Sequence, residues 1–205
     1  SWVSVVNANI GGDKNWIAAD QTGGPYANYV YGVMTNTSFN ACNVTRSTDY
    51  GASFALITSL TPHTLPGAMV CVGPNGSVQC GSVYVVTNSG NSFASTYTFF
   101  RSTDGGASYS NMSFQNFANT VGTQVGGRNS VQNMRTRPYP LICADNSYGP
   151  NRGRLYVIYA SNNPVGNGNK PDIFCRYSTD GGATFSAEVI VDDDLNSQNN
   201  NQWMP

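Results

Sequence analysis

Short apolar runs recur along the chain, each bounded by Gly, Asn or Pro, and they fall into groups of four. The runs are 4 to 8 residues long and rich in Val, Ile, Tyr, Phe and Thr, and several alternate polar with apolar positions. Such runs are typical of β-strands. No stretch keeps an apolar period of 3.6 residues after a capped start, so we expect a protein that is nearly all β. The expected strands cover 16–20, 28–35, 42–47 and 54–60; 68–73, 81–88, 96–102 and 109–114; and 139–145, 153–160, 172–178 and 187–192.

The turn between the third and fourth run of each group is written almost identically three times. The copies are "RSTDYGASFA" from position 46, "RSTDGGASYS" from 101 and "YSTDGGATFS" from 177. In the shared pattern Ser-x-Asp-x-Gly-x-x-aromatic, Ser and Asp can bond turn amides, Gly can adopt a positive φ, and the ring can pack beneath the hairpin. We interpret these residues as structural: Ser47, Asp49, Gly51 and Phe54; Ser102, Asp104, Gly106 and Tyr109; and Ser178, Asp180, Gly182 and Phe185.

Repetition of a four-strand unit predicts the blades of a β-propeller. Four antiparallel strands repeated every several tens of residues are typical of this fold. The ending "NNNQWMP" is similar to "GGDKNWIAA" near the start, and propellers close with roughly four to eight blades, so we expect a larger chain or completion by other copies. The expected parts are blade 1 at about 13–62, blade 2 at about 66–115, an insertion loop at about 115–135, blade 3 at about 136–194 and the start of a fourth blade at 199–205.

The charge balance argues against nucleic-acid partners. The chain contains 10 Lys plus Arg and 11 Asp plus Glu, which gives a net charge of -1. It therefore lacks the excess of basic residues that binds polyanions. Charged residues make up only 10%, and the uncharged polar surface favours an extracellular or cell-surface protein whose partners are glycans or further copies of itself. No apolar run approaches the roughly 20 residues that span a bilayer.

Few residues are available as metal ligands. The chain has five cysteines, one histidine and no CxxC pair, so we expect neither zinc nor another cofactor. The segment "VDDDLNSQNNN" (191–201) contains oxygen ligands that calcium accepts, but it lacks the EF-hand spacing, and we favour a loop between blades.

Two kinds of covalent modification are suggested by short motifs. Cys71 and Cys80 bracket "VGPNGSVQ", so a disulfide across a hairpin is one interpretation, with free thiols as the alternative. Glycosylation sequons occur at Asn36, Asn43, Asn75 and Asn111. About five sequons would arise by chance from this composition, so their number does not prove glycosylation.

The three repeated turns resemble the Asp-box (bacterial neuraminidase repeat) family. The wording "DKNWIAAD", "GRLYVIYA" and "RYSTDGGATFS" is also similar to secreted sialidase-like propellers of bacteria, over nearly the whole chain. In that family the box lies between the third and fourth strands of a blade, away from the catalytic face. The resemblance implies that an active site would need three arginines for the sugar carboxylate, a Tyr nucleophile activated by a Glu, and an Asp as general acid.

A complete site of that kind cannot be assembled from this chain. Glu188 is the only glutamate and falls in an outer strand, where a solvated role is favoured. The family's Arg-Ile-Pro motif is absent. The segment "MRTRPYP" (134–140) has Arg137 before Pro138 and is only distantly similar to that motif, so we assign it no catalytic role. The aspartates outside the repeated turns and the run 192–194 are Asp13, Asp20, Asp145 and Asp172.

Three functions remain open at this point. We expect a non-catalytic protein, in glycan recognition or in an extracellular structural assembly such as a fibre or surface layer. The alternative is an exo-sialidase or related glycoside hydrolase that is completed by blades absent from this chain. A propeller that binds only protein partners is the third.

Overall fold

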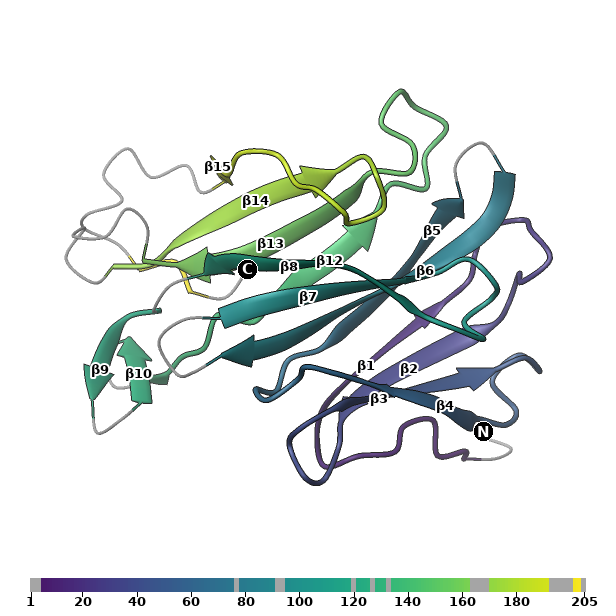
Figure 1. Cartoon of the computed structure of the whole chain (residues 1–205), viewed down its shortest axis with the longest axis horizontal. Helices are drawn as coiled ribbons and strands as arrows, with labels where there is room; N and C mark the ends of the chain where they lie inside the picture. Colours follow the sequence, from purple (N-terminus) through teal and green to yellow (C-terminus); the bar gives the residue numbers. More distant parts are fainter. Residues whose placement is uncertain are drawn as a thin grey trace.

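Three four-stranded antiparallel sheets make up most of the computed structural model, which describes residues 5–75, 78–90, 95–118, 121–125, 128–131, 134–162, 170–191 and 201–203. In each sheet the spatial order of the strands equals their order in the chain (Figure 1). The first sheet contains β1 (Asp13–Ala19), β2 (Val30–Thr35), β3 (Cys42–Ser47) and β4 (Ala55–Leu60); the second β5 (Met69–Asn75), β6 (Val78–Gly90), β7 (Ser95–Ser102) and β8 (Ser110–Ala118); the third β12 (Leu141–Ala144), β13 (Leu155–Ser161), β14 (Asp172–Ser178) and β15 (Val189–Ile190).

The three sheets are consecutive blades of a β-propeller. Their first strands lie beside one another, β1 against β5 and β5 against β12, so the sheets radiate from a shared inner row (Figure 1). All twelve strands expected from the apolar runs are present, and the all-β prediction is confirmed. No helix in the described residues is long and apolar enough to cross a membrane.

The insertion between the second and third sheets forms structure of its own. In place of the loop expected at 115–135, β8 continues to Ala118 and a small sheet follows. The buried side chain of Asn162 accepts a bond from the backbone N of Gly122 at 3.2 Å and donates to its O at 3.1 Å, which ties the insertion to the third sheet. The small sheet contains β9 (Thr123–Val125), β10 (Arg128–Val131) and β11 (Met134–Arg135).

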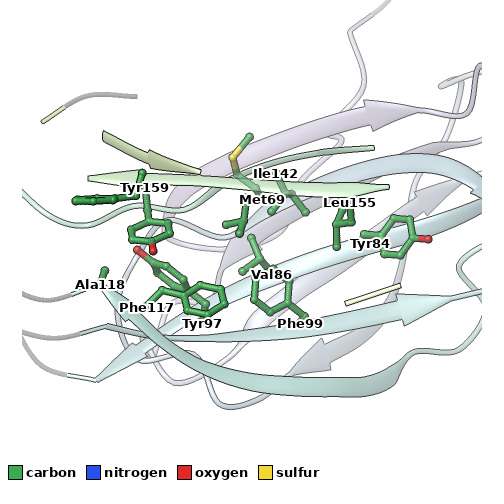
Figure 2. Packing of buried hydrophobic residues seen from close by; sticks show 12 residues of the cluster. Met69, Tyr84, Val86, Tyr97, Phe99, Phe117, Ala118, Ile142, Leu155 and Tyr159 are labelled. Atoms are coloured by element: carbon green, nitrogen blue, oxygen red, sulfur yellow. The ribbon is translucent and has the colours of Figure 1, made fainter. Parts of the chain in front are cut away.

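Apolar side chains fill the space between neighbouring sheets. Val33 and Val44 of the first sheet pack with Val70 and Val85 of the second, and all four are at most 1% exposed. An aromatic cluster joins the second sheet to the third, as Figure 2 shows for Tyr97, Phe99, Phe117 and Tyr159. Burial of such side chains stabilises by roughly 1.5–3 kcal/mol each. Alternate residues along the strands of the second sheet therefore pack on opposite sides, one set against the first sheet and the other against the third.

The three repeated turns, called box turns here (47–54, 102–109 and 178–185), share one hydrogen-bond pattern. In each of them the Ser hydroxyl donates to the Asp Oδ1 at 2.7 Å, and the Gly backbone N donates to the Ser Oγ at 2.8 Å. The Gly residues have φ of +86°, +75° and +95°, a region that favours glycine. The box turns thus close the hairpins β3–β4, β7–β8 and β14–β15, as a structural role requires.

We expect the box turns to weaken in acid. Hydrogen bonds from Ser53 and Ser47 lower the pKa of Asp49 from 3.8 to about 2. Partial burial raises the pKa of Asp104, but hydrogen bonds from Ser108 and Ser102 outweigh it and bring that pKa to about 2 as well. A carboxyl group whose pKa is depressed by folding stabilises the protein above its unfolded pKa, and this contribution disappears as pH falls through the folded pKa. The free energy of unfolding in urea should therefore decrease between about pH 4 and pH 2.

The matched variant for this pH series is Asp104→Asn. It keeps a hydrogen-bond acceptor but removes the titrating group, so its unfolding free energy should fall less steeply over the same range. An unchanged pH slope in Asp104→Asn would contradict the assignment.

The disulfide between Cys71 and Cys80 is not formed. Cys71 is a free thiol. In the register of β5 with β6 it stands opposite Tyr84, while Gly81 pairs with Pro74, so Cys80 lies several positions away along the partner strand. The two cysteines bracket the turn in the sequence, but the pairing of the strands does not bring them opposite each other.

Candidate functional site

A cavity of about 470 Å³ lies at the start of the innermost strands. Within each sheet the first and third strands run in the same direction, so the box turns, which follow the third strands, lie at the opposite edge. The volume is within the range of small-molecule sites. We call this cavity the axial pocket; its lining residues are Lys14, Arg135, Thr136, Arg137, Tyr139, Leu141 and Trp203.

A β-bulge places Lys14 at the pocket. The pairing of β1 with β2 shifts register between Asp13 and Asn15, and Lys14 between them has a φ of +51°. A positive φ is uncommon for a residue other than glycine, and bulges often re-aim a side chain near a functional site. The Lys14 ammonium binds the Asp13 carboxylate at 3.0 Å, and both side chains remain accessible to solvent.

The loop that carries Arg137 and Tyr139 is held on three sides. The fully buried Tyr97 donates its hydroxyl to the Pro138 carbonyl at 2.7 Å, and the Thr136 hydroxyl donates to the Val121 carbonyl. The Tyr139 ring lies against Gly67, where an added Cβ would come within 2.3 Å of the ring. A loop fixed in this way holds its side chains at the pocket wall before any ligand binds.

The axial pocket combines positive charge with aromatic rings. Lys14, Arg135 and Arg137 contribute three cations, and Tyr139 and Trp203 contribute two rings. Trp203 also packs against the cluster of Val121, Ala160 and Ile173, so it has a fixed support. Guanidinium groups bind carboxylates in a planar, bidentate manner, and aromatic faces support flat apolar surfaces. The arrangement can therefore bind a small molecule that carries a carboxylate.

The aspartates that could serve as a general acid do not converge on this pocket. Asp20 and Asp145 follow the ends of β1 and β12, at the edge of the box turns, where each accepts a bond from the backbone two residues on. Asp172 is buried at the start of β14 and is not part of the pocket wall. Asp13 is nearest, next to Lys14. Within the described residues, one partly buried carboxylate therefore lies beside the pocket and none lines it.

A Tyr, an Arg and the glutamate do come together, but away from the pocket. The Tyr159 hydroxyl donates to Glu188 Oε2 at 3.2 Å and accepts from Arg176 Nε at 2.9 Å, and Arg176 pairs with Glu188 at 2.8 Å. Burial raises the pKa of Tyr159 to about 12 despite the bonds from Arg176. Because Tyr159 is 0% exposed in the core between two sheets, a sugar cannot reach it. The expectation that Glu188 lies on a solvated face is corrected to a half-buried ion pair.

His63 is also a structural residue. It is fully buried after β4, where Asn88 N donates to its Nδ1 at 3.1 Å and its Nε2 lies 2.8 Å from the Thr35 hydroxyl. Burial lowers the pKa of His63 to about 4, so the ring is neutral near pH 7. It joins the first sheet to the second rather than serving an accessible site.

The sequons and metal positions receive only partial structural description. Asn36 and Asn43 donate their side-chain N–H groups to Asn40 and to the Ile10 carbonyl, whereas Asn111 is exposed on β8. Asn75 accepts a bond from an arginine at the end of β7. Glycosylation at these four positions stays a prediction. Calcium binding also stays a prediction, because residues 192–200 lie outside the part of the chain that the structure describes. Within the described part, no group of three or more His, Cys, Asp or Glu could hold a metal ion.

Structural comparison finds the same fold in parts of two larger proteins. An α-L-arabinofuranosidase from Fusarium graminearum with an iminosugar inhibitor matches at a TM-score of 0.60 and 14% identity, over 86% of this chain and 47% of that one. The α-L-arabinanase of Penicillium chrysogenum with arabinobiose matches at 0.55 and 13%, over 85% and 48%. This chain therefore spans about half the length of these structures. No known protein family matches it by sequence, and no curated protein does.

Proposed function

We propose that this sialidase-like propeller binds acidic glycans in the axial pocket without cleaving them. The observation that carries the proposal is the convergence of Lys14, Arg135 and Arg137 with Tyr139 and Trp203 at a cavity of about 470 Å³. Cations bind the carboxylate, and the rings support the sugar plane. Cleavage of a glycosidic bond needs a proton donor and a group that stabilises positive charge at the anomeric carbon. The described walls of the pocket contain no such pair.

The structural neighbours support a carbohydrate ligand. Their structures hold an iminosugar inhibitor and arabinobiose. At 13–14% identity these likenesses concern the fold, so the preference for an acidic sugar comes from the residues of this chain. The repeated box turns support membership of the Asp-box group and, with it, a location outside the cell or at its surface.

A glycoside hydrolase completed by further blades is the second candidate. This chain spans 47% of the arabinofuranosidase, so additional sheets can supply an acid and a nucleophile around the same axis. The open side of the third sheet supports the existence of a neighbouring sheet. Cys143 is exposed there, whereas the equivalent Cys71 packs in the core between two sheets, and Val189 is 59% exposed. Another part of a longer chain or a second copy would cover this face.

A binding and turnover panel separates the candidates. The protein is titrated with sialyllactose, lactose and arabinobiose in a calorimeter, and the products of each incubation are analysed by chromatography. Recognition without catalysis predicts binding of sialyllactose, weaker binding of the neutral sugars and no product. Release of monosaccharide favours the hydrolase, and equal affinity for lactose and sialyllactose would refute recognition of the acidic group.

A further inference from the structure

One loop joins the first sheet to the second at the same edge as the axial pocket. It covers residues 61–68, between β4 and β5, and we call it the His63 loop. The backbone of Gly67 in this loop lies directly against the Tyr139 ring, since a Cβ added at Gly67 would come within 2.3 Å of that ring. Tyr139 lines the axial pocket. The His63 loop therefore supports a side chain of the proposed glycan site.

Hydrogen bonds to one residue of β6 hold the loop closed. The Asn88 carbonyl accepts from the backbone N of Thr64 and of Leu65, both at 3.1 Å. The Asn88 side-chain amide donates to the Pro66 carbonyl at 3.4 Å, and its backbone N donates to His63 Nδ1 at 3.1 Å. Asn88 and His63 are both 0% exposed. The loop is thus fastened to the second sheet by four bonds, one of which depends on the imidazole ring.

The hydrogen bonds of His63 require a neutral ring. Because Nδ1 accepts the Asn88 N–H, the ring proton lies on Nε2, which is 2.8 Å from the Thr35 hydroxyl and donates to it. A protonated imidazole carries N–H groups at both nitrogens, so its Nδ1–H would face the Asn88 N–H and the bond between them would be lost. Burial lowers the pKa of His63 from 6.5 to about 4, in agreement with this arrangement. Protonation of His63 and closure of the loop therefore oppose each other.

Within the described residues, His63 is the group beside the loop whose charge changes near neutral pH. Histidine is the only side chain with an ordinary pKa between pH 5 and pH 8. Asp13 and Lys14 pair with each other, and burial raises the pKa of Cys42 to about 12, so this thiol stays neutral. Burial also raises the pKa of Tyr97. The titratable side chains on the adjoining elements, from β1, β3, β7 and the segment before β12, are Asp13, Lys14, Cys42, Tyr97, Arg135, Arg137 and Tyr139.

We propose that the His63 loop makes the axial pocket sensitive to pH: protonation of His63 opens the loop, and a glycan in the pocket keeps it closed. This regulation rests on the proposed function, because its ligand is the glycan of the axial pocket. An open loop no longer supports Tyr139, so the pocket binds its ligand in the closed form. Proton and glycan favour different forms, and each therefore weakens the binding of the other by the same factor.

Opening of the loop should depend on pH in a defined window. In the open loop His63 is in water with a pKa of 6.5, whereas in the closed loop the value is about 4. A group whose pKa is lowered by closure stabilises the closed form fully above pH 6.5, and this contribution is lost as the pH falls toward 4. The equilibrium constant for opening should therefore rise about 30-fold from pH 7.5 to pH 5. The box turns titrate lower, because the pKa of Asp49 and of Asp104 is about 2.

The test is amide hydrogen exchange of the full chain, measured by NMR at pH 7.5 and pH 5. The rates are expressed as protection factors, which removes the intrinsic pH dependence of exchange. Protection of the Thr64, Leu65 and Asn88 amides should fall about 30-fold at pH 5. The Gly106 amide, which donates within a box turn, is the control and should keep its protection. His63→Gln is the matched variant: it keeps one acceptor and one donor but does not titrate, so its loop amides should be equally protected at both pH values.

The coupling to the pocket is measured with sialyllactose at pH 5. A ligand that binds only the closed form should, at 100 times its Kd, raise the protection of the same three amides about 100-fold. Lactose at the same concentration lacks the carboxylate and should raise it less.

The outcomes separate the loop from the glycan site. Equal protection at pH 7.5 and pH 5 in the native protein overturns the role of His63, as does an equal fall in folded His63→Gln. Binding of sialyllactose without added protection of the loop amides overturns the coupling. Absence of sialyllactose binding refutes the proposed function and with it the coupling, whereas the pH series without sugar decides the role of His63 by itself.

A measurement on the native protein replaces the variant if His63→Gln does not fold. His63 is the only histidine of the chain, so its ring signals in an NMR titration belong to one residue. A pKa near 4 supports the proposal, and a pKa near 6.5 overturns it.

Discussion

Gly106→Ala should destabilise the protein by about 2–5 kcal/mol, clearly more than the same change in the other two box turns. All three glycines have a positive φ, so alanine brings a strain of roughly 1–2 kcal/mol at each. A Cβ at Gly106 would also lie 2.6 Å from the Tyr31 ring, which is 0% exposed and cannot move aside. At Gly51 nothing lies within 4 Å, and at Gly182 the neighbours are at 3.4 Å or more.

These three substitutions form a matched series for the packing of box turns against the preceding sheet. Urea denaturation should give a small loss for Gly51→Ala and for Gly182→Ala and the large loss for Gly106→Ala. Equal losses at Gly51 and Gly106 would mean that the second box turn does not pack on the first sheet as described.

The double substitution Lys14→Gln and Arg135→Gln should weaken binding of sialyllactose about 100-fold or more. Each cation supplies charge-assisted hydrogen bonds to a carboxylate, worth roughly 1.5–3 kcal/mol, and each 1.4 kcal/mol is a factor of ten in affinity. Both side chains are accessible, so the fold should be retained.

Arg152→Gln is the control for charge at a distance, because Arg152 lies at the other edge of the sheets. It should leave the affinity for sialyllactose unchanged. A loss as large as that of the Lys14 and Arg135 pair would show that general positive charge, and not the axial pocket, attracts the ligand.

The strands could be predicted from the sequence because their side chains alternate between two faces. β3 and β14 have the expected bounds, and most others differ by one to three residues. β15 is shorter than the expected 187–192, since Glu188 pairs with Arg176, whose Nη1 also binds the Ser186 carbonyl. Side-chain contacts between β14 and the residues before β15 therefore take the place of some backbone hydrogen bonds of the sheet. The alternation of apolar and polar residues in the sequence does not reveal such contacts.

The axial pocket could not be predicted in the same way. Lys14 and the loop around Arg137 are more than 120 positions apart and meet because the first strands of the blades gather around one axis. The sequence "MRTRPYP" lacks the motif of sialidases, so the sequence alone assigns it no role. The signal that could have singled it out is two arginines and a tyrosine just before the first strand of a blade.

The partners of that loop were equally hidden. Tyr97 reads as an ordinary strand residue, and only the fold shows that its hydroxyl holds the Pro138 carbonyl. The box turns were predictable for the opposite reason, since the hydrogen bonds of their Ser and Asp side chains join residues at most four positions apart.

The most direct measurement is backbone hydrogen exchange in the native protein with and without sialyllactose. Recognition at the axial pocket predicts slower exchange in 134–141 and around Lys14, with no change in the box turns 102–109 and 178–185. Binding of the sugar without protection of 134–141, or with protection at the box turns alone, would contradict the assignment of this pocket as the glycan site.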